Sequence, residues 1–220
     1  MKKIDTIIFD LDGTLLDTLD DLKNSIVYVQ EKNGFPVHSR EMVRRNVGNG
    51  MPNLISKSVP EGTSQEKQAE ILADFKAHYA VHSTDFTKPY PGVMELLEAT
   101  RQEGYKIAIV SNKADAAVKL LNEKYFEDYF TVVIGENEAA GIRKKPAPDT
   151  VLAAVEQLGS QVENCVYIGD SEVDILTAKN SEMPCILCEW GFRDKEELME
   201  QGGNIFVSNA MDILKEIKKL

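Results

Sequence analysis

The sequence predicts an α/β protein: a doubly wound (Rossmann-like) parallel sheet core with a small all-helical block inserted after the first strand. Residues 7–9 form a short apolar, β-branched run, which is typical of a buried strand. Residues 16–82 then show helical periodicity without a strand pattern, and from residue 93 onward apolar runs alternate with amphipathic helices. We therefore expect a core domain of residues 1–15 and 83–220 and a helical domain of residues 16–82.

The inserted block is predicted to contain four helices. Thr18 is the expected N-cap of the first, with Asp21 three residues on, and Thr63 with Glu66 makes a capping-box pattern for the last. Apolar residues at spacings of three and four give each helix one buried face. The four helices are predicted to begin near residues 18, 39, 51 and 63.

The core is predicted to alternate strands and helices after a proline-containing linker at residues 85–92. Short apolar runs mark the strands, and Gly or Pro residues mark the helix ends. The predicted strands are residues 106–110, 132–134, 165–168, 185–187 and 205–207. The predicted helices are residues 93–103, 114–124, 148–158, 173–179 and 211–219.

Composition excludes several classes of partner. The formal net charge of −11 argues against a nucleic-acid or anionic membrane surface, since both need clustered Lys and Arg. No stretch approaches the roughly 20 apolar residues of a membrane span. Three cysteines are too few for a disulfide framework. We expect a cytoplasmic protein, a monomer or homodimer, with no nucleic-acid or membrane partner.

Chemistry-bearing residues follow the predicted strands. Ligands bind beyond the carboxyl ends of parallel strands, so these residues define the candidate site. Asp10 and Asp12 follow the first strand and Ser111 follows the second. Lys145 stands before a proline in the loop after the third, and Asp170 follows the fourth. Each alone could be a turn, a helix cap or a solvated loop, but together they indicate a site for a phosphate and a divalent cation.

This set of residues indicates phosphoryl transfer to a carboxylate. A phosphate monoester dianion repels a carboxylate nucleophile, so Mg²⁺ and a lysine must first neutralise it. Asp10 and Asp170 can supply the oxygen ligands that Mg²⁺ prefers. One Asp can attack phosphorus while a second protonates the leaving alkoxide and then deprotonates water. Asp10 and Asp12 face the same side of an extended segment and can share one substrate.

These motifs resemble those of the haloacid dehalogenase (HAD) superfamily, in its phosphatase branch. The matching segments, in chain order, are Asp10-Leu11-Asp12-Gly13-Thr14, Ser111, Lys145 before Pro146, and Gly169-Asp170-Ser171-Glu172-Val173-Asp174. The resemblance implies that Asp10 is the nucleophile and Asp12 the general acid/base. It implies Ser111 and Lys145 as phosphoryl ligands, with Mg²⁺ on Asp10, the carbonyl of Asp12, and Asp170. Asp174 and Asn112 would support this site, and the helical block resembles a cap that selects the leaving group.

Within this superfamily the chain is similar to phosphoglycolate phosphatase-like proteins. Segments that carry the similarity are Asp17-Thr18-Leu19-Asp20-Asp21-Leu22, Val47-Gly48-Asn49-Gly50, Ser111-Asn112-Lys113 and Trp190-Gly191-Phe192-Arg193. The resemblance implies a small-molecule phosphate ester as partner, with phosphoglycolate as one candidate. Arg45, Gly48 and Asn49, with Arg44, are candidate substrate-binding residues of the cap, although the arginines could equally form a solvated helix face.

Several alternatives stay open at this stage. A phosphomutase similar to β-phosphoglucomutase, or a pyrophosphatase, would use the same motifs. A receiver-type signalling module also phosphorylates an Asp, but it lacks an inserted helical block. His78 and His82 have metal-ligand spacing but fit partly buried histidines better. Cys185 and Cys188 on a strand would point to opposite faces, which favours core cysteines over a redox pair.

Overall fold

A computed structural model describes residues 4–137 and 141–220 of the chain. It divides into two compact units, one of Met1–Leu16 with Pro89–Leu220 and one of Asp17–Lys88. We call them the core unit and the helical unit. Two short strands, β2 (Leu16–Asp17) and β3 (Lys88–Pro89), pair where the chain passes between the units. The strand β2 differs from the prediction that no strand lies within residues 16–82.

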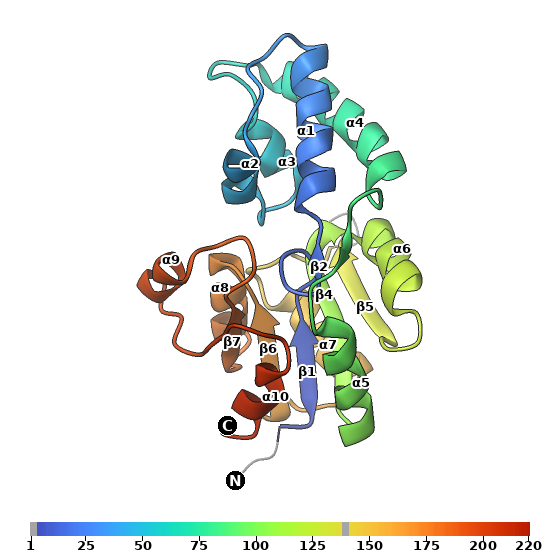
Figure 1. The fold of residues 1–220 in the computed structure, drawn as a ribbon, viewed down its shortest axis with the longest axis vertical. Helices are drawn as coiled ribbons and strands as arrows, with labels where there is room; N and C mark the ends of the chain where they lie inside the picture. Colours follow the sequence, from blue (N-terminus) through green and yellow to red (C-terminus); the bar gives the residue numbers. More distant parts are fainter. Residues whose placement is uncertain (1–3, 138–140) are drawn as a thin grey trace. The chain divides into compact units, whose positions relative to one another are not determined.

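The core unit contains a six-stranded sheet in the order β5-β4-β1-β6-β7-β8, and all its neighbouring strands run parallel (Figure 1). The predicted doubly wound parallel sheet is confirmed. The chain first builds outward from β1 through β4 to β5, then returns to the other side of β1 with β6. The carboxyl ends of β1, β4 and β6 therefore meet at the switch point where such sheets bind ligands. The strands are β1 Thr6–Phe9, β4 Lys106–Ala114, β5 Val132–Glu136, β6 Cys165–Gly169, β7 Cys185–Cys188 and β8 Phe206–Val207.

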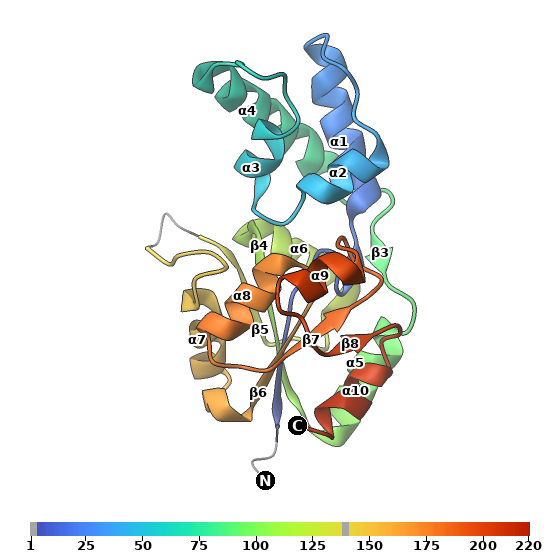
Figure 2. The same cartoon turned by 90° about the vertical axis from the view of Figure 1, so that its left-hand side faces the viewer.

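Helices cover both faces of this sheet, as Figure 2 shows for α7 and α8 on one side and α5 and α10 on the other. Successive residues of β1 supply the two cores: Ile7 and Phe9 pack with α5, α6 and α10, and Ile8 packs with α7 and α8. The strands are buried on both faces, which explains their continuous apolar sequences. The helices are α5 Val93–Glu103, α6 Asp115–Phe126, α7 Asp149–Gln157, α8 Glu172–Asn180, α9 Lys195–Glu200 and α10 Asp212–Ile217.

The core unit differs from the prediction at two places. Strand β4 continues to Ala114, so that Ser111 lies within the strand, and its pairing with β5 is irregular between Val110 and Ala114. Helix α9 was not predicted, because Leu198 is its one buried residue and no apolar spacing marks it. Cys188 packs in the cluster of Ile7 and Cys185 packs against the other face, so the prediction of opposite faces is confirmed.

The helical unit contains α1 Leu19–Lys32, α2 Arg40–Asn46, α3 Met51–Ser56 and α4 Gln65–His82. Thr18 is the N-cap residue of α1, as predicted, but its hydroxyl makes no capping hydrogen bond, and the Asp21 carboxylate instead accepts hydrogen bonds from the backbone of Phe86 and Thr87. The predicted cap of α4 is wrong. The cap of α4 is Ser64, whose hydroxyl accepts from the N–H of Lys67, rather than Thr63.

The two histidines of α4 are partly buried, as expected. His78 shares a hydrogen bond with Ser25 and stacks on Tyr28, and His82 pairs with Asp85. Among the helices of the described residues, none combines the length and the apolar character needed to cross a membrane.

Candidate active site

Asp10 and Asp12 lie where β1 ends, at the switch point of the sheet. Asp10 is buried, and its backbone N–H donates to the carbonyl of Ile168 on the neighbouring strand β6, at 2.9 Å. Asp12 is partly exposed, and both of its carboxylate oxygens accept from Lys113 Nζ, at 2.8 and 3.0 Å. The Lys113 side chain is only 3% exposed. The two carboxylates are therefore held separately, each with its own lysine.

Lys145 is the lysine that holds Asp10. Its ammonium lies 2.8 Å from Asp10 Oδ1, 2.8 Å from Asp174 Oδ1 and 2.9 Å from the hydroxyl of Tyr167. An ammonium has three donors, so these acceptors satisfy it completely. Burial opposes its charge, but the attraction of Asp10 and Asp174 outweighs burial and raises the pKa of Lys145 well above its usual value.

Asn112 anchors the loop that carries Lys145. Its side-chain amide donates to the Lys145 carbonyl at 3.0 Å, so β4 fixes the position of that loop. Ser111, the residue before it, is 3% exposed and accepts a hydrogen bond from the backbone N–H of Lys113. The register that pairs Phe9 with Ile109 places Ser111 level with the residues that follow β1.

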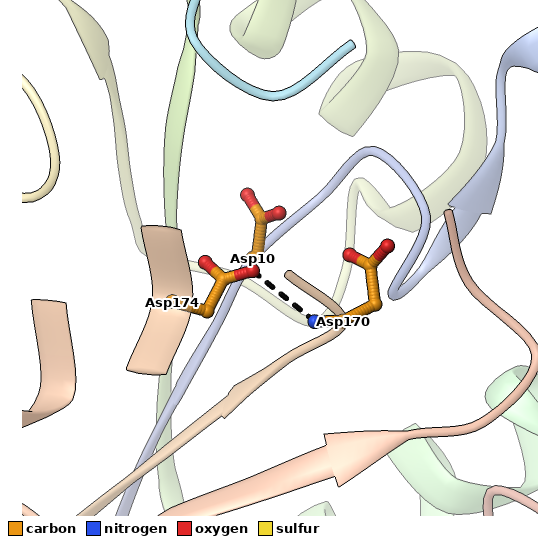
Figure 3. A group of neighbouring side chains, drawn as sticks. All are labelled: Asp10, Asp170 and Asp174. Atoms are coloured by element: carbon orange, nitrogen blue, oxygen red, sulfur yellow. Dashed lines mark hydrogen bonds between the residues drawn. The ribbon is translucent and has the colours of Figure 1, made fainter. Parts of the chain in front are cut away.

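Asp174 is buried on α8 and accepts from five donors. Besides Lys145 and Tyr167, the backbone N–H groups of Asp170 and Ser171 and the Ser171 hydroxyl donate to it. Burial alone would raise the pKa of Asp174, but Lys145 and these hydrogen bonds lower it. Figure 3 shows the bond from the Asp170 backbone to Asp174 beside the side chain of Asp10.

Asp170 follows β6 and binds only neutral donors among the described residues. Its Oδ1 accepts from the Thr14 hydroxyl at 3.0 Å and its Oδ2 from the backbone N–H of Phe192 at 2.6 Å. Burial raises the pKa of Asp170 well above its usual value, and the negative charges of Asp174 and Asp10 add to this. Burial likewise raises the pKa of Asp10 to about 7, against the opposing effect of Lys145.

These carboxylates fit a divalent cation. Oxygens of Asp10, Asp170 and Asp174 all lie within 4.8 Å of one another. Three buried carboxylates face one buried ammonium, and a cation with two charges would compensate the excess. Asp174 already accepts from five donors, one of them the Lys145 ammonium, whereas each oxygen of Asp170 accepts from a single neutral donor. Asp10 and Asp170 are therefore the candidate direct ligands and Asp174 a supporting residue.

Two glycines leave the space that Asp170 occupies. A Cβ on Gly13 would lie 2.4 Å from Asp170 Oδ2, and one on Gly191 would lie 2.2 Å from Asp170 Cβ. Gly13 also has a φ of +90°, in the region that glycine favours. The backbone thus encloses this carboxylate on two sides.

The core unit alone supplies this cluster of predicted residues. The predicted cap residues Arg45, Gly48 and Asn49 belong to the helical unit. Arg45 Nε donates to Glu41 at 2.9 Å from the exposed face of α2, and Gly48, with a φ of +124°, and Asn49 lie between α2 and α3.

The structure adds residues that the sequence did not single out. Tyr167 contacts Lys145, Thr14 and Phe192 hold Asp170, and Lys113 pairs with Asp12. Thr14, Lys113 and Phe192 stood in segments that resemble the family, but no role was inferred for them. A polar hydroxyl inside the otherwise apolar strand β6 was the available signal for Tyr167.

Comparisons with known proteins agree with this arrangement. The model of the haloacid dehalogenase-like hydrolase family matches residues 7–188. The phosphoglycolate phosphatase of Aquifex aeolicus is 31% identical, over 95% of this chain and 94% of that protein. A relative from Caldanaerobacter subterraneus, provisionally named pyrophosphatase PpaX, is 30% identical over 98% of this chain and 96% of its own length.

A solved structure agrees over the whole chain. The provisionally named phosphoglycolate phosphatase of Lactobacillus delbrueckii has a TM-score of 0.93 and 36% identity, with 98% of both chains covered. The prediction of a phosphatase of the HAD superfamily is confirmed by the family match and by the names of these relatives. The chain belongs to the haloacid dehalogenase-like hydrolase family, among relatives named as phosphoglycolate phosphatases.

Proposed function

We propose that this protein hydrolyses small-molecule phosphate monoesters with Mg²⁺, through an aspartyl-phosphate on Asp10. The observation that carries the proposal is the buried cluster in which Lys145 reaches Asp10 and Asp174 at 2.8 Å while Asp170 binds only neutral donors among the described residues. Such a cluster has one carboxylate for attack, one for a cation and one lysine for the phosphoryl group.

Asp10, the backbone carbonyl of Asp12, and Asp170 would hold Mg²⁺. When bound, the ion supplies charge that offsets the phosphoryl oxygens and lets a carboxylate approach phosphorus. Lys145 would exchange one of its three present acceptors for a phosphoryl oxygen, and Ser111 would bind another, because both residues stand at the same edge of the sheet as Asp10.

The reaction proceeds in two displacements. In the first, a carboxylate oxygen of Asp10 bonds to phosphorus, the bond from phosphorus to the leaving oxygen breaks, and Asp12 donates its proton to that oxygen. In the second, Asp12 takes a proton from water, the water oxygen bonds to phosphorus, and the bond to Asp10 breaks. Inorganic phosphate leaves and both carboxyl groups return to their initial states.

The candidate substrate is phosphoglycolate, since relatives that cover nearly the whole chain carry that name. Pyrophosphate is the second candidate, and the relative from Caldanaerobacter subterraneus favours testing it. We propose that residues 16–82 act as the cap that selects the leaving group, with Arg45, Gly48 and Asn49 as substrate contacts. Arg45→Met should then raise the KM for phosphoglycolate more than the KM for a neutral alkyl phosphate.

A panel of phosphate esters, with and without Mg²⁺, tests the function. We expect release of phosphate from small monoesters that requires Mg²⁺, is abolished by Asp10→Asn and is retained in Asp5→Asn, a control at the opposite end of β1. Retained turnover in Asp10→Asn would overturn the assignment of the nucleophile. Isomerised sugar phosphate without free phosphate would instead show a phosphomutase.

The signalling alternative differs in the lifetime of the phosphorylated protein. A receiver-type module would hold phosphate on Asp10 without catalytic release. Multiple turnovers per protein molecule exclude it, and a stable phosphoprotein with at most one phosphate released would favour it.

A further inference from the structure

The position of Asp170 depends on a short segment after β7, residues 190–193. The backbone N–H of Phe192 donates to Asp170 Oδ2, and Gly191 lies so close that a Cβ would meet Asp170. The indole N–H of Trp190 donates to the Thr14 carbonyl at 3.1 Å, while the Thr14 hydroxyl donates to Asp170 Oδ1. This segment therefore contacts Asp170 directly and also holds the second loop that contacts it.

Arg193 ties the same segment to the start of α8. Its Nε lies 2.8 Å from Glu172 Oε2, and its Nη2 lies 3.2 Å from Glu172 Oε1. The pair is bidentate, which fixes its geometry, and the Arg193 side chain is only 10% exposed. Glu172 stands two residues after Asp170, and Arg193 directly follows Phe192. The two chain segments are thus joined twice, once at Asp170 and once at Glu172.

We propose that the Arg193–Glu172 pair is a positioning clamp that sets the Mg²⁺ affinity of Asp170. The inference rests on the proposed function, because it assumes that Asp170 is a ligand of Mg²⁺. The ion demands near-octahedral geometry, and loss of groups that orient a metal ligand typically weakens binding about 10–100-fold. Without the clamp, the segment no longer holds the Phe192 N–H against Asp170, and the carboxylate loses its fixed orientation.

The sign of the effect separates a clamp from simple electrostatics. Arg193→Met removes a positive charge near the cation site, so charge alone would make Mg²⁺ bind more tightly. The clamp predicts the opposite, weaker binding. Arg193→Lys keeps the charge but cannot form the bidentate pair, and we expect it to lose affinity as well. The control is Lys195→Met, which removes a positive charge and the Lys195–Glu189 ion pair at 2.6 Å in the neighbouring chain segment.

Mg²⁺ binding is measured without substrate, by isothermal titration calorimetry and by fluorescence of Trp190, the single tryptophan of the chain. We expect the dissociation constant to rise about 10–100-fold in Arg193→Met and in Arg193→Lys, and to change less than about 3-fold in Lys195→Met. The metal-free melting temperatures of the variants show that each is folded. A variant that combines Glu172→Gln with Arg193→Met should bind Mg²⁺ no more weakly than whichever single variant has the higher dissociation constant, since the pair acts as a unit.

Unchanged or tighter Mg²⁺ binding in folded Arg193→Lys overturns the clamp. In that case the proposed function still stands, provided that the wild-type protein binds Mg²⁺. An equal loss in Lys195→Met also overturns it, because the effect would then not be specific to the Arg193–Glu172 pair. If the wild-type protein itself does not bind Mg²⁺, both the clamp and the Mg²⁺-dependent function fail.

Discussion

Replacing Tyr167 by Phe removes one acceptor from a buried ammonium whose donors are fully used. Lys145 Nζ has three N–H groups and three partners, Asp10, Asp174 and the Tyr167 hydroxyl, and its side chain is 2% exposed. The variant keeps the ring and both carboxylates, but it leaves one charged donor without an acceptor in a buried site and also removes the hydrogen bond from the hydroxyl to Asp174. An unsatisfied buried donor costs about 1–3 kcal/mol, and a charged donor costs more than a neutral one, so the loss should be at least in the upper part of that range.

We therefore expect Tyr167→Phe to lower the free energy of unfolding by about 2–3 kcal/mol. For a protein of this length, that loss corresponds to a decrease in melting temperature of roughly 4–12 °C. The assay is urea and thermal denaturation in EDTA, so that a bound cation does not add its own stabilisation. Tyr105→Phe is the control, since Tyr105 is partly exposed and lies outside the cluster, and its change should stay within about 0.5 kcal/mol.

The test is the change in the free energy of unfolding in Tyr167→Phe compared with that in Tyr105→Phe. A loss below about 0.5 kcal/mol in Tyr167→Phe, equal to that of the control, would refute the reasoning that Lys145 needs all three acceptors. Such a result would mean that the ammonium finds a third partner without the hydroxyl, and that its position is set by the carboxylates alone.

Three further predictions test other parts of the site. In Lys113→Met, the Asp12 carboxylate loses the ammonium that holds it and should protonate the leaving oxygen less efficiently. Hydrolysis of alkyl phosphates should then fall by at least about 10-fold, and hydrolysis of nitrophenyl phosphate should fall less. Equal losses for the two substrates would contradict a role of Lys113 in protonation of the leaving group. Gly13→Ala places a Cβ 2.4 Å from Asp170 Oδ2, so urea denaturation should show a loss of at least about 2 kcal/mol, and an unchanged protein would contradict the packing. In EDTA, the melting temperature of the wild type should fall relative to Asp10→Asn as the pH rises from about 4 to about 7. The reason is that folded Asp10, with its pKa raised to about 7, keeps a proton that the unfolded chain has released. A melting temperature of the wild type that rises relative to that of Asp10→Asn over this pH range would refute the raised pKa of Asp10.

The parts of the fold that the sequence predicted correctly rest on local patterns. The apolar run ending at Phe9 predicts a buried strand without knowledge of its neighbours, and Gly104, which ends α5 with a φ of +75°, is a local stop signal. The carboxyl-end rule for parallel strands then predicts that Asp10, Lys145 and Asp170 lie close together. Their contacts in the core unit agree with that expectation.

The parts that could not be predicted depend on contacts between residues far apart in the chain. Asp21 has the spacing of a capping residue, yet its carboxylate binds Phe86 and Thr87, which only the folded chain brings near. Lys113 on β4 contacts Asp12 after β1, and no local pattern in the sequence shows that these two strands are neighbours. Side-chain identity indicates what a residue can bind, whereas strand order decides which partner it meets.

Direct detection of phosphate on Asp10 tests the account most sharply. The wild-type protein, turning over a phosphate ester with Mg²⁺, is quenched in acid within one turnover, digested and mapped by mass spectrometry. The account predicts one phosphoryl group on the peptide that contains Asp10, absent from Asp10→Asn and lost when the reaction is allowed to finish before the quench. A phosphoryl group on another residue, or rapid turnover without any phosphorylated peptide, would contradict it.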